Sequence, residues 1–298
     1  MGELFIKKFG IPKVAYNAID TFFRKEEVDF VEKINKDIFN EKDIKEIIGE
    51  NTKDFIKESY RRGVISIDSV EDKTYCICNF KRFLDIFVVS ETETYRNIEN
   101  YRDISDWFFE EYYKNKEPDP TKPASPDVIM TLDEICDFID RQDRDIYLNY
   151  CDCRGFAGDC GKPRRTCITY HDEPNSFVHR GLSEKIDKER AKQVVRDADR
   201  EGLMHTANSG GICNCCRDCC YLFKASDRRG SQGVWPPSKH RIVFHKDKCI
   251  GCGKCVNRCY YNVFTKEGRD VNADTSTCVG CGICATGCPV GAIEIVDK

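Results

Sequence analysis

The sequence predicts an α+β fold in three parts, residues 1–117, 127–225 and 240–298. Three observations lead to this division. The first part alternates helical patterns with two strand-like runs, and seventeen of the 20 cysteines lie in the second half of the chain. A stretch with four prolines, 114–127, follows the first part, and a Gly/Pro-containing stretch, 226–238, precedes the third. We therefore expect a metal-free N-terminal part and a metal-rich C-terminal half.

The first part reads as helices followed by a hairpin. Apolar residues recur every three or four positions in the expected helices, and Gly49 and Gly63 stop two of them. Two β-type runs joined by a polar loop come next. This order is typical of a winged helix, so residues 1–117 are predicted to form a winged-helix-like docking domain. The expected helices cover 15–24, 26–35, 41–48, 53–62, 81–89 and 104–114, and the expected strands cover 64–68 and 74–79.

The middle part opens with a capped helix. Thr131 stands at the N-cap and Glu134 follows three residues later, which is the capping-box pattern. A short strand is expected over 145–150. A second helix is expected over 184–201, beginning at Ser183. These elements give residues 127–225 some regular structure around their cysteines.

The last part repeats one cysteine spacing, Cys-x2-Cys-x2-Cys-x3-Cys. This is the bacterial two-cluster run, in which the fourth cysteine of each run binds the other cluster. Structural zinc usually takes two CxxC pairs with a spacer, which two matched four-cysteine runs do not resemble. We therefore predict two [4Fe–4S] clusters. The predicted ligands are Cys249, Cys252, Cys255 and Cys288 for cluster I, and Cys278, Cys281, Cys284 and Cys259 for cluster II.

Residues 241–297 resemble bacterial two-cluster ferredoxins, so residues 240–298 are expected to be a ferredoxin-like domain. Tyr260 departs from the pattern, because that family usually has proline after the fourth cysteine of a run. The whole chain also resembles a family of anaerobe multi-cluster ferredoxin-domain proteins with a winged-helix-like N-terminal part. The motifs that carry this second resemblance are YRRGVIS, YCDCRGFAGDC, EGLMHTANSGGICNCC and CIGCGKC…CVGCGICATGCP. It implies 4Fe–4S binding and says little about the reaction.

Nine further cysteines lie in the middle part and do not follow the ferredoxin spacing. They suffice for two four-cysteine cubanes with one left over, or for one cubane plus structural thiols. Non-cubane clusters also use vicinal cysteines, and zinc is the main alternative, because CxC and CxxC both suit tetrahedral zinc. Adjacent cysteines such as Cys215 and Cys216 are expected to serve different sites. Of three nearby histidines, His205 is the best ligand candidate. We predict one or two further Fe–S clusters, with the grouping left open, from Cys151, Cys153, Cys160, Cys167, Cys213, Cys215, Cys216, Cys219 and Cys220.

Charge and absent motifs exclude several functions. Residues 1–120 carry 20 basic and 26 acidic side chains, a net charge of −6, which disfavours binding to DNA phosphates. Asp54 and Glu58 also interrupt the basic residues of the expected recognition helix, 53–62. The sequence has no Rossmann glycine motif, P-loop or CxxCH haem motif. It has no signal-peptide pattern and no apolar run that could span a bilayer, so we expect a cytoplasmic protein in a reducing compartment.

The leading functional prediction is an electron-transfer protein or subunit. It would relay low-potential electrons to a larger oxidoreductase or to a cofactor that needs reductive activation. The first alternative is an Fe–S redox-sensing winged-helix regulator, whose DNA binding would depend on cluster state. The second is a catalytic reductase that uses an atypical middle cluster. A protein redox partner is expected, and nucleic acid is not.

Overall fold

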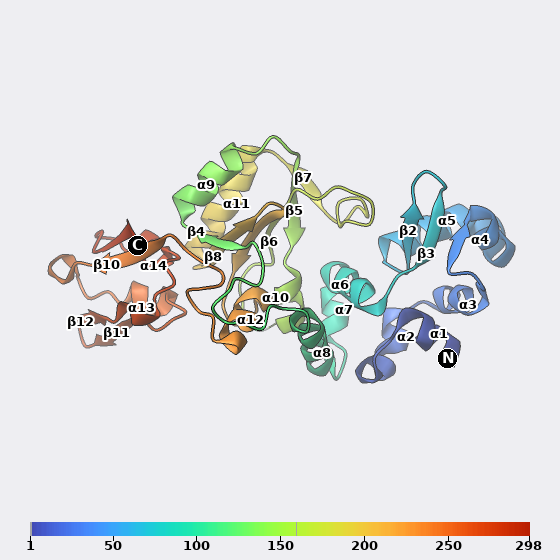
Figure 1. The fold of residues 1–298 in the computed structure, drawn as a ribbon, viewed down its shortest axis with the longest axis horizontal. Helices are drawn as coiled ribbons and strands as arrows, with labels where there is room; N and C mark the ends of the chain where they lie inside the picture. Colours follow the sequence, from blue (N-terminus) through green and yellow to red (C-terminus); the bar gives the residue numbers. More distant parts are fainter. Residues whose placement is uncertain (1, 159) are drawn as a thin grey trace. The chain divides into compact units, whose positions relative to one another are not determined.

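The computed structural model describes residues 2–158 and 160–298. Helices and strands are mixed throughout, which confirms the predicted α+β class. The chain forms two compact units, and the second holds most of the chain from Tyr113 onward. The first unit runs to Tyr112 and also includes Gly155–Gly158 and His171–Glu184. Figure 1 shows both units.

The first unit packs helices against a small antiparallel sheet of order β1-β3-β2. Its core is rich in phenylalanine, and the rings of Phe23 and Phe83 stack with centroids 4.2 Å apart. Strand β1 was not predicted from the sequence, because three residues are too few to show a period. The elements are α1 (Glu3–Phe9), η1 (Lys13–Ala18), α2 (Ile19–Phe22), α3 (Lys25–Lys33), β1 (Ile38–Asn40), α4 (Glu41–Ile48), η2 (Gly49–Asn51), α5 (Thr52–Arg61), β2 (Ile65–Ser69), β3 (Thr74–Ile77), α6 (Phe80–Ser90), α7 (Thr92–Arg96) and α8 (Tyr101–Tyr113).

Helix α4 begins at Glu41 because Asn40 caps its N-terminus. The side chain of Asn40 accepts hydrogen bonds from the backbone N–H groups of Lys42 and Asp43. The Asp43 carboxylate accepts from the Asn40 N–H at 2.9 Å, which completes a capping box. The strands β2 and β3 then form the hairpin that the sequence predicts. The further assignment of this unit to the winged-helix class stays a prediction.

A segment from the middle of the chain, 171–184, packs within the first unit. The side-chain amide of Asn175 pairs with the backbone of Ile67 on the edge strand β2, accepting and donating at 2.8 Å. Arg180 is buried at 3% exposure and donates to the carbonyl oxygens of Ile65, at 3.1 Å, and Tyr60. Sequence position alone places this segment in the middle part. Its contacts with the first unit join residues more than 100 positions apart, and such contacts leave no local signal in the sequence.

Replacing Arg180 by alanine is expected to destabilise the first unit by about 3 kcal/mol. The change removes the buried donor to the Ile65 carbonyl oxygen and one of the donors to the Tyr60 carbonyl oxygen, and a buried polar group that loses its partner costs about 1–3 kcal/mol. Thermal unfolding and amide hydrogen exchange of β2 in the full chain measure the effect. Arg190→Ala, at an exposed arginine of the second unit, is the control. Equal stability of the two variants would contradict the assigned role of Arg180.

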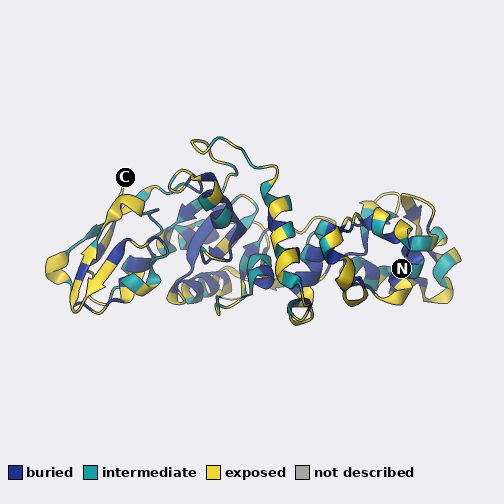
Figure 2. Cartoon of the chain, turned by 90° about the horizontal axis from the view of Figure 1, so that it is seen from below, coloured by how far each residue is buried: buried dark blue, intermediate teal, exposed yellow. Residues whose placement is uncertain are grey.

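The second unit is built on a six-stranded sheet of order β4-β8-β9-β6-β5-β7. Helices α9 and α11 lie against one face, and their Ile135, Ile139 and Val195 share a core with Leu148 and Ile168 of the strands (Figure 1). Most strand residues near this core are buried (Figure 2). The elements before the ferredoxin-like module are β4 (Val128–Met130), α9 (Leu132–Asp140), β5 (Ile146–Tyr150), α10 (Asp152–Ala157), β6 (Arg165–Thr169), β7 (Glu184–Ile186), α11 (Lys188–Arg200), β8 (Met204–Asn208), β9 (Gly211–Cys215) and α12 (Tyr221–Arg229).

The two predicted helix starts in this unit have different outcomes. The capping box at Thr131 is confirmed: its hydroxyl accepts from the Glu134 N–H, and the Glu134 carboxylate accepts from the Thr131 N–H at 2.9 Å. The predicted start at Ser183 is wrong. Asp187 caps α11 by accepting from the Arg190 N–H at 2.7 Å. The three residues before Asp187 form β7 instead, at the edge of the sheet.

The two linker-like stretches contain anchored residues. Arg229 on α12 is buried, and its guanidinium donates to the carbonyl oxygens of Asp119 at 2.5 Å and Lys122 at 3.0 Å. The fully buried Trp235 donates its ring N–H to the Ser125 hydroxyl at 2.8 Å. Proline content predicts irregular chain here, but these contacts hold it in place.

Candidate metal centres

The C-terminal module consists of two antiparallel strand pairs and four short helical segments. Strand β10 (His240–Phe244) pairs with β13 (Ile293–Asp297), and β11 (Phe264–Glu267) pairs with β12 (Asp270–Ala273). Most cysteines of each run precede or begin a short helix. The remaining elements are η3 (Lys246–Lys248), α13 (Lys254–Arg258), η4 (Thr275–Thr277) and α14 (Ile283–Thr286).

The eight cysteines of this module line two cavities, four in each, and the sets cross between the two runs. One cavity also contains Phe244, Val290 and Ile293, and the other Tyr261, Val263 and Phe264. Four thiols around an apolar cavity fit a cubane cluster, which needs one thiolate for each iron. The structure thus brings together the residues that the sequence assigned to each cluster. The first cavity has Cys249, Cys252, Cys255 and Cys288, and the second has Cys259, Cys278, Cys281 and Cys284.

Backbone N–H groups point at the cysteine sulfurs. The Gly251 N–H donates to the Cys249 sulfur and the Gly280 N–H to the Cys278 sulfur, both at 3.4 Å. Both glycines have positive φ, and a Cβ on either one would collide with a carbonyl oxygen. Only glycine therefore suits these turns. The hydrogen bonds stabilise negative charge on the sulfurs, which is one of the factors that set a cluster's reduction potential.

Burial keeps several of these thiols protonated when no metal is bound. It raises the pKa of Cys281 to about 12 and also raises the pKa of Cys255 and Cys284. A low-dielectric environment disfavours the thiolate, whereas a bound metal requires it. Metal binding in these cavities must therefore release protons.

The nine middle cysteines divide into a group of six and a group of three. Each of the six thiols interacts with two of the others, and these interactions link them into a closed ring that joins α10, β6, β9 and the start of α12. Cys213 and Cys215 lie two apart on β9 and therefore face the same side of the sheet. We call this group the thiol ring. In the order of these interactions it consists of Cys151, Cys153, Cys220, Cys215, Cys213 and Cys167.

The other three, Cys160, Cys216 and Cys219, cluster with Asp218, and we call them the thiol triad. Their metal-binding atoms all lie within 4.8 Å of one another. The vicinal pairs separate as expected: Cys216 and Cys219 lie in the triad, whereas their neighbours Cys215 and Cys220 lie in the ring. Sequence reasoning missed Asp218, because a lone exposed aspartate carries no signal in the sequence.

Arg154 is a buried cation beside both groups, and the sequence did not single it out. It is 2% exposed and donates to the Asn214 carbonyl at 2.8 Å and to the Thr166 hydroxyl. Burial opposes its charge, but the neighbouring thiolates, Cys151 foremost, outweigh burial and raise the pKa of Arg154. Its electrostatic partners include ring residues and Cys216 of the triad. A fixed positive charge here stabilises anionic sulfur ligands.

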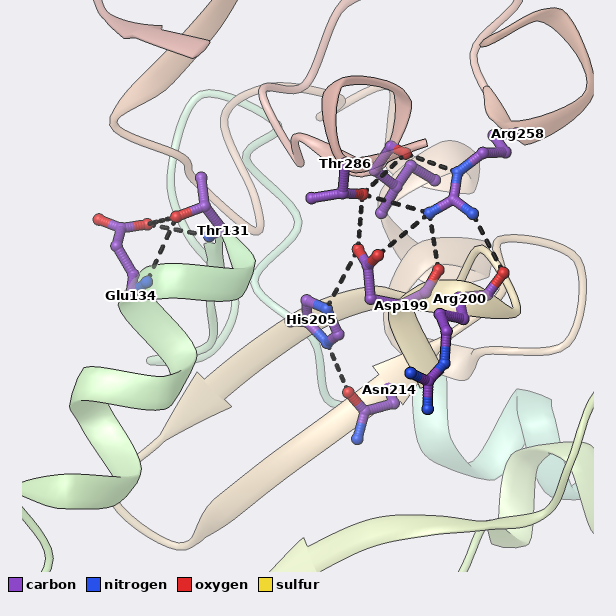
Figure 3. A network of polar contacts seen from close by, with 9 residues as sticks. Thr131, Glu134, Asp199, Arg200, His205, Asn214, Arg258 and Thr286 are labelled. Carbon is purple, nitrogen blue, oxygen red and sulfur yellow. Dashed lines mark hydrogen bonds and ion pairs between the residues drawn. The ribbon is translucent and has the colours of Figure 1, made fainter. Parts of the chain in front are cut away.

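The predicted histidine ligand does not lie with the cysteines. His205 is fully buried, and its Nδ1 lies 2.5 Å from the Asn214 amide oxygen (Figure 3). His205 pairs with Asn214 across β8 and β9, one position away from the cysteines of β9. Because side chains alternate along a strand, the pair faces away from Cys213 and Cys215. No histidine belongs to a compact metal-capable group within residues 2–158 and 160–298.

The cysteine-rich region and the ferredoxin-like module meet through two arginines. Arg258, next to Cys259, donates to the Asp199 carbonyl at 2.6 Å and pairs with its carboxylate at 3.3 Å (Figure 3). Arg217, next to Cys216, donates to the Tyr260 carbonyl at 2.8 Å. Both contacts flank Cys259, which places a cavity-lining cysteine close to the middle region.

Comparison with protein families matches residues 242–295 to a model described as a 4Fe-4S dicluster domain. The match covers the eight cysteines of the two cavities and supports an iron–sulfur electron-transfer role. The search of curated proteins found no match. Within the described residues, no helix has the length and apolar character needed to cross a membrane.

Proposed function

We propose that this protein transfers electrons through iron–sulfur clusters, relaying them at low potential to a larger oxidoreductase or to a cofactor that needs reductive activation. The observation that carries the proposal is the pair of cavities, each lined by four cysteines drawn from both runs. Clusters bound there supply one-electron chemistry. The chain supplies thiolates, apolar walls and amide hydrogen bonds from Gly251 and Gly280.

A further redox centre in the thiol ring would extend the relay. Six thiols exceed the needs of one cubane, and Arg154 beside them offsets negative charge. Arg258 and Arg217 hold the ferredoxin-like module against this region on both sides of Cys259. An electron could therefore pass between the module and the ring within one compact unit.

The first unit would dock a protein partner. Its excess of acidic residues disfavours nucleic acid, and the structure of α5 adds a second argument. Arg62, one of the plausible phosphate contacts, is 12% exposed in its side chain and forms an ion pair with Glu27 at 2.7 Å. It also donates to the Phe22 carbonyl at 2.8 Å. Arg62 thus holds the unit together and is not presented to DNA.

Redox titration of the full chain, purified anaerobically, tests the proposed function. We expect more than eight irons per chain and at least two one-electron reductions at low potential. Protein reduced with dithionite should pass these electrons to a low-potential viologen dye. Absence of any reducible iron–sulfur signal would contradict the proposal. Submicromolar binding to the DNA upstream of its own gene, changing with cluster oxidation at near-physiological salt, would favour the redox-sensing regulator instead.

A further inference from the structure

The thiol triad has a different geometry from the two ferredoxin cavities. The sulfurs of Cys160 and Cys216 lie 3.7 Å apart, and all four ligand atoms of the group, with Cys219 and Asp218, lie within 4.8 Å of one another. Among the described residues, no three of the ferredoxin cysteines are gathered this closely. The two kinds of site are therefore built for groups of different size.

The spacing fits one metal ion. In a tetrahedral site with zinc–sulfur bonds of about 2.3 Å, two sulfurs lie about 3.8 Å apart, because a tetrahedron's edge is about 1.6 times its centre-to-corner distance. In a cubane each thiolate binds a different iron, so the sulfurs stand much farther apart. The 3.7 Å separation matches the single ion. Three thiolates and one carboxylate are also ligands that zinc accepts.

We propose that Cys160, Cys216, Cys219 and Asp218 bind one zinc ion in a tetrahedral site of three sulfurs and one oxygen. The thiol ring is not part of this site, and no three of its sulfurs form a group as compact as the triad among the described residues. The ring remains the place for a further iron–sulfur cluster. The zinc proposal stands independently of electron transfer, since zinc has no redox chemistry.

The site would fix the surface against which the ferredoxin-like module packs. Its ligands tie the loop after α10 to the turn before α12. Arg217, between the ligands Cys216 and Asp218, donates to the Tyr260 carbonyl and lies over the Tyr261 ring at 4.6 Å. The half-buried phenol of Tyr260 lies within electrostatic reach of Cys216, Asp218 and Cys160. The tyrosine that replaces the usual proline therefore brings its phenol near the proposed ligands.

Zinc-edge X-ray absorption on the anaerobically purified full chain tests the site without any mutation. We expect about one zinc per chain, with three sulfurs at about 2.3 Å and one oxygen at about 2.0–2.2 Å. Iron clusters elsewhere do not contribute to this edge. A shell of four sulfurs would overturn the proposal, because the thiol triad offers only three and the zinc would then lie in the thiol ring or in a ferredoxin cavity. Absence of zinc from protein grown and purified with zinc present would also overturn it.

Matched variants separate the triad from the ring. Cys219→Ser should lose the zinc and keep the iron, whereas Cys153→Ser should lose iron and keep the zinc. Cys136→Ser, a cysteine of α9 outside both groups, should keep both metals. Loss of about four irons from Cys219→Ser, with zinc unchanged or absent, would assign the triad to a cubane and overturn the proposal.

Asp218→Asn tests the fourth ligand while keeping all three thiols. We expect zinc to be removed by a chelator at least about tenfold more readily than from the wild type, because even residues that only support a ligand contribute that much. Asp143→Asn, on the exposed loop after α9, is the control. Unchanged zinc retention and an unchanged oxygen in the X-ray absorption spectrum would show that Asp218 is not a ligand.

Discussion

Cys259→Ser and Cys281→Ser are each expected to remove the same cluster, although the two residues lie in different cysteine runs. The two thiols line one cavity together with Cys278 and Cys284. The loss should be about four irons per chain, together with one of the two ferredoxin signals in the EPR spectrum of the reduced protein. Iron quantitation and EPR on the full chain measure both effects.

Cys252→Ser provides the matched comparison, since Cys252 precedes Cys259 in the same run but lines the other cavity. Its spectrum should lack the signal that survives in Cys259→Ser. If Cys259→Ser and Cys252→Ser lose the same signal, the ligands do not cross and each run holds its own cluster. The comparison distinguishes the two ligand schemes, because crossed ligands group Cys259 with Cys281 and uncrossed ligands group it with Cys252.

Local features of the fold could be predicted from the sequence, and long-range ones could not. The Thr131–Glu134 capping box and the helix over 41–48 depend on residues three or four apart, so the pattern is visible in the sequence. Strands β1 and β7 have three residues each, and only their pairing within a sheet defines them. The docking of Arg180 on β2 depends on contacts more than 100 residues away.

The candidate sites also divide into features that local spacing predicts and features that depend on long-range contacts. The ferredoxin spacing predicts its own ligand sets, because three cysteines of each short run bind one cluster and the fourth binds the other. The thiol ring depends on the register of β6 against β9 and on the position of α10. Period-two alternation places Cys213 and Cys215 on one face, and vicinal cysteines must diverge, but neither rule says which distant thiol they meet. The sequence does not single out Arg154 either, because its role as a counter-charge depends on its burial beside the thiols.

If the thiol ring holds the proposed iron–sulfur cluster, Arg154→Met is expected to make that cluster harder to reduce and to lower the amount of cluster bound. Arg154 is buried beside ring thiolates, so its loss leaves their charge uncompensated. At an effective dielectric constant near 20, one charge about 4 Å away contributes about 4 kcal/mol and one twice as far about half of that, so we expect a shift on the order of 100 mV for one electron. Lower iron content is also expected, and removing one partner of a buried charge pair costs about 3–5 kcal/mol of stability.

EPR-monitored redox titration of the full chain can follow the ring signal separately from the two ferredoxin signals. Arg154→Lys should retain most of the potential, because it keeps the charge while losing the paired donation to Asn214 and Thr166. Arg229→Met is the matched control, since Arg229 is also a buried arginine that donates to carbonyl oxygens, but it holds Asp119 and Lys122. It should lower stability without moving the ring potential. A shift of equal size in Arg154→Met and Arg229→Met would mean that Arg154 acts through folding alone and not through its charge.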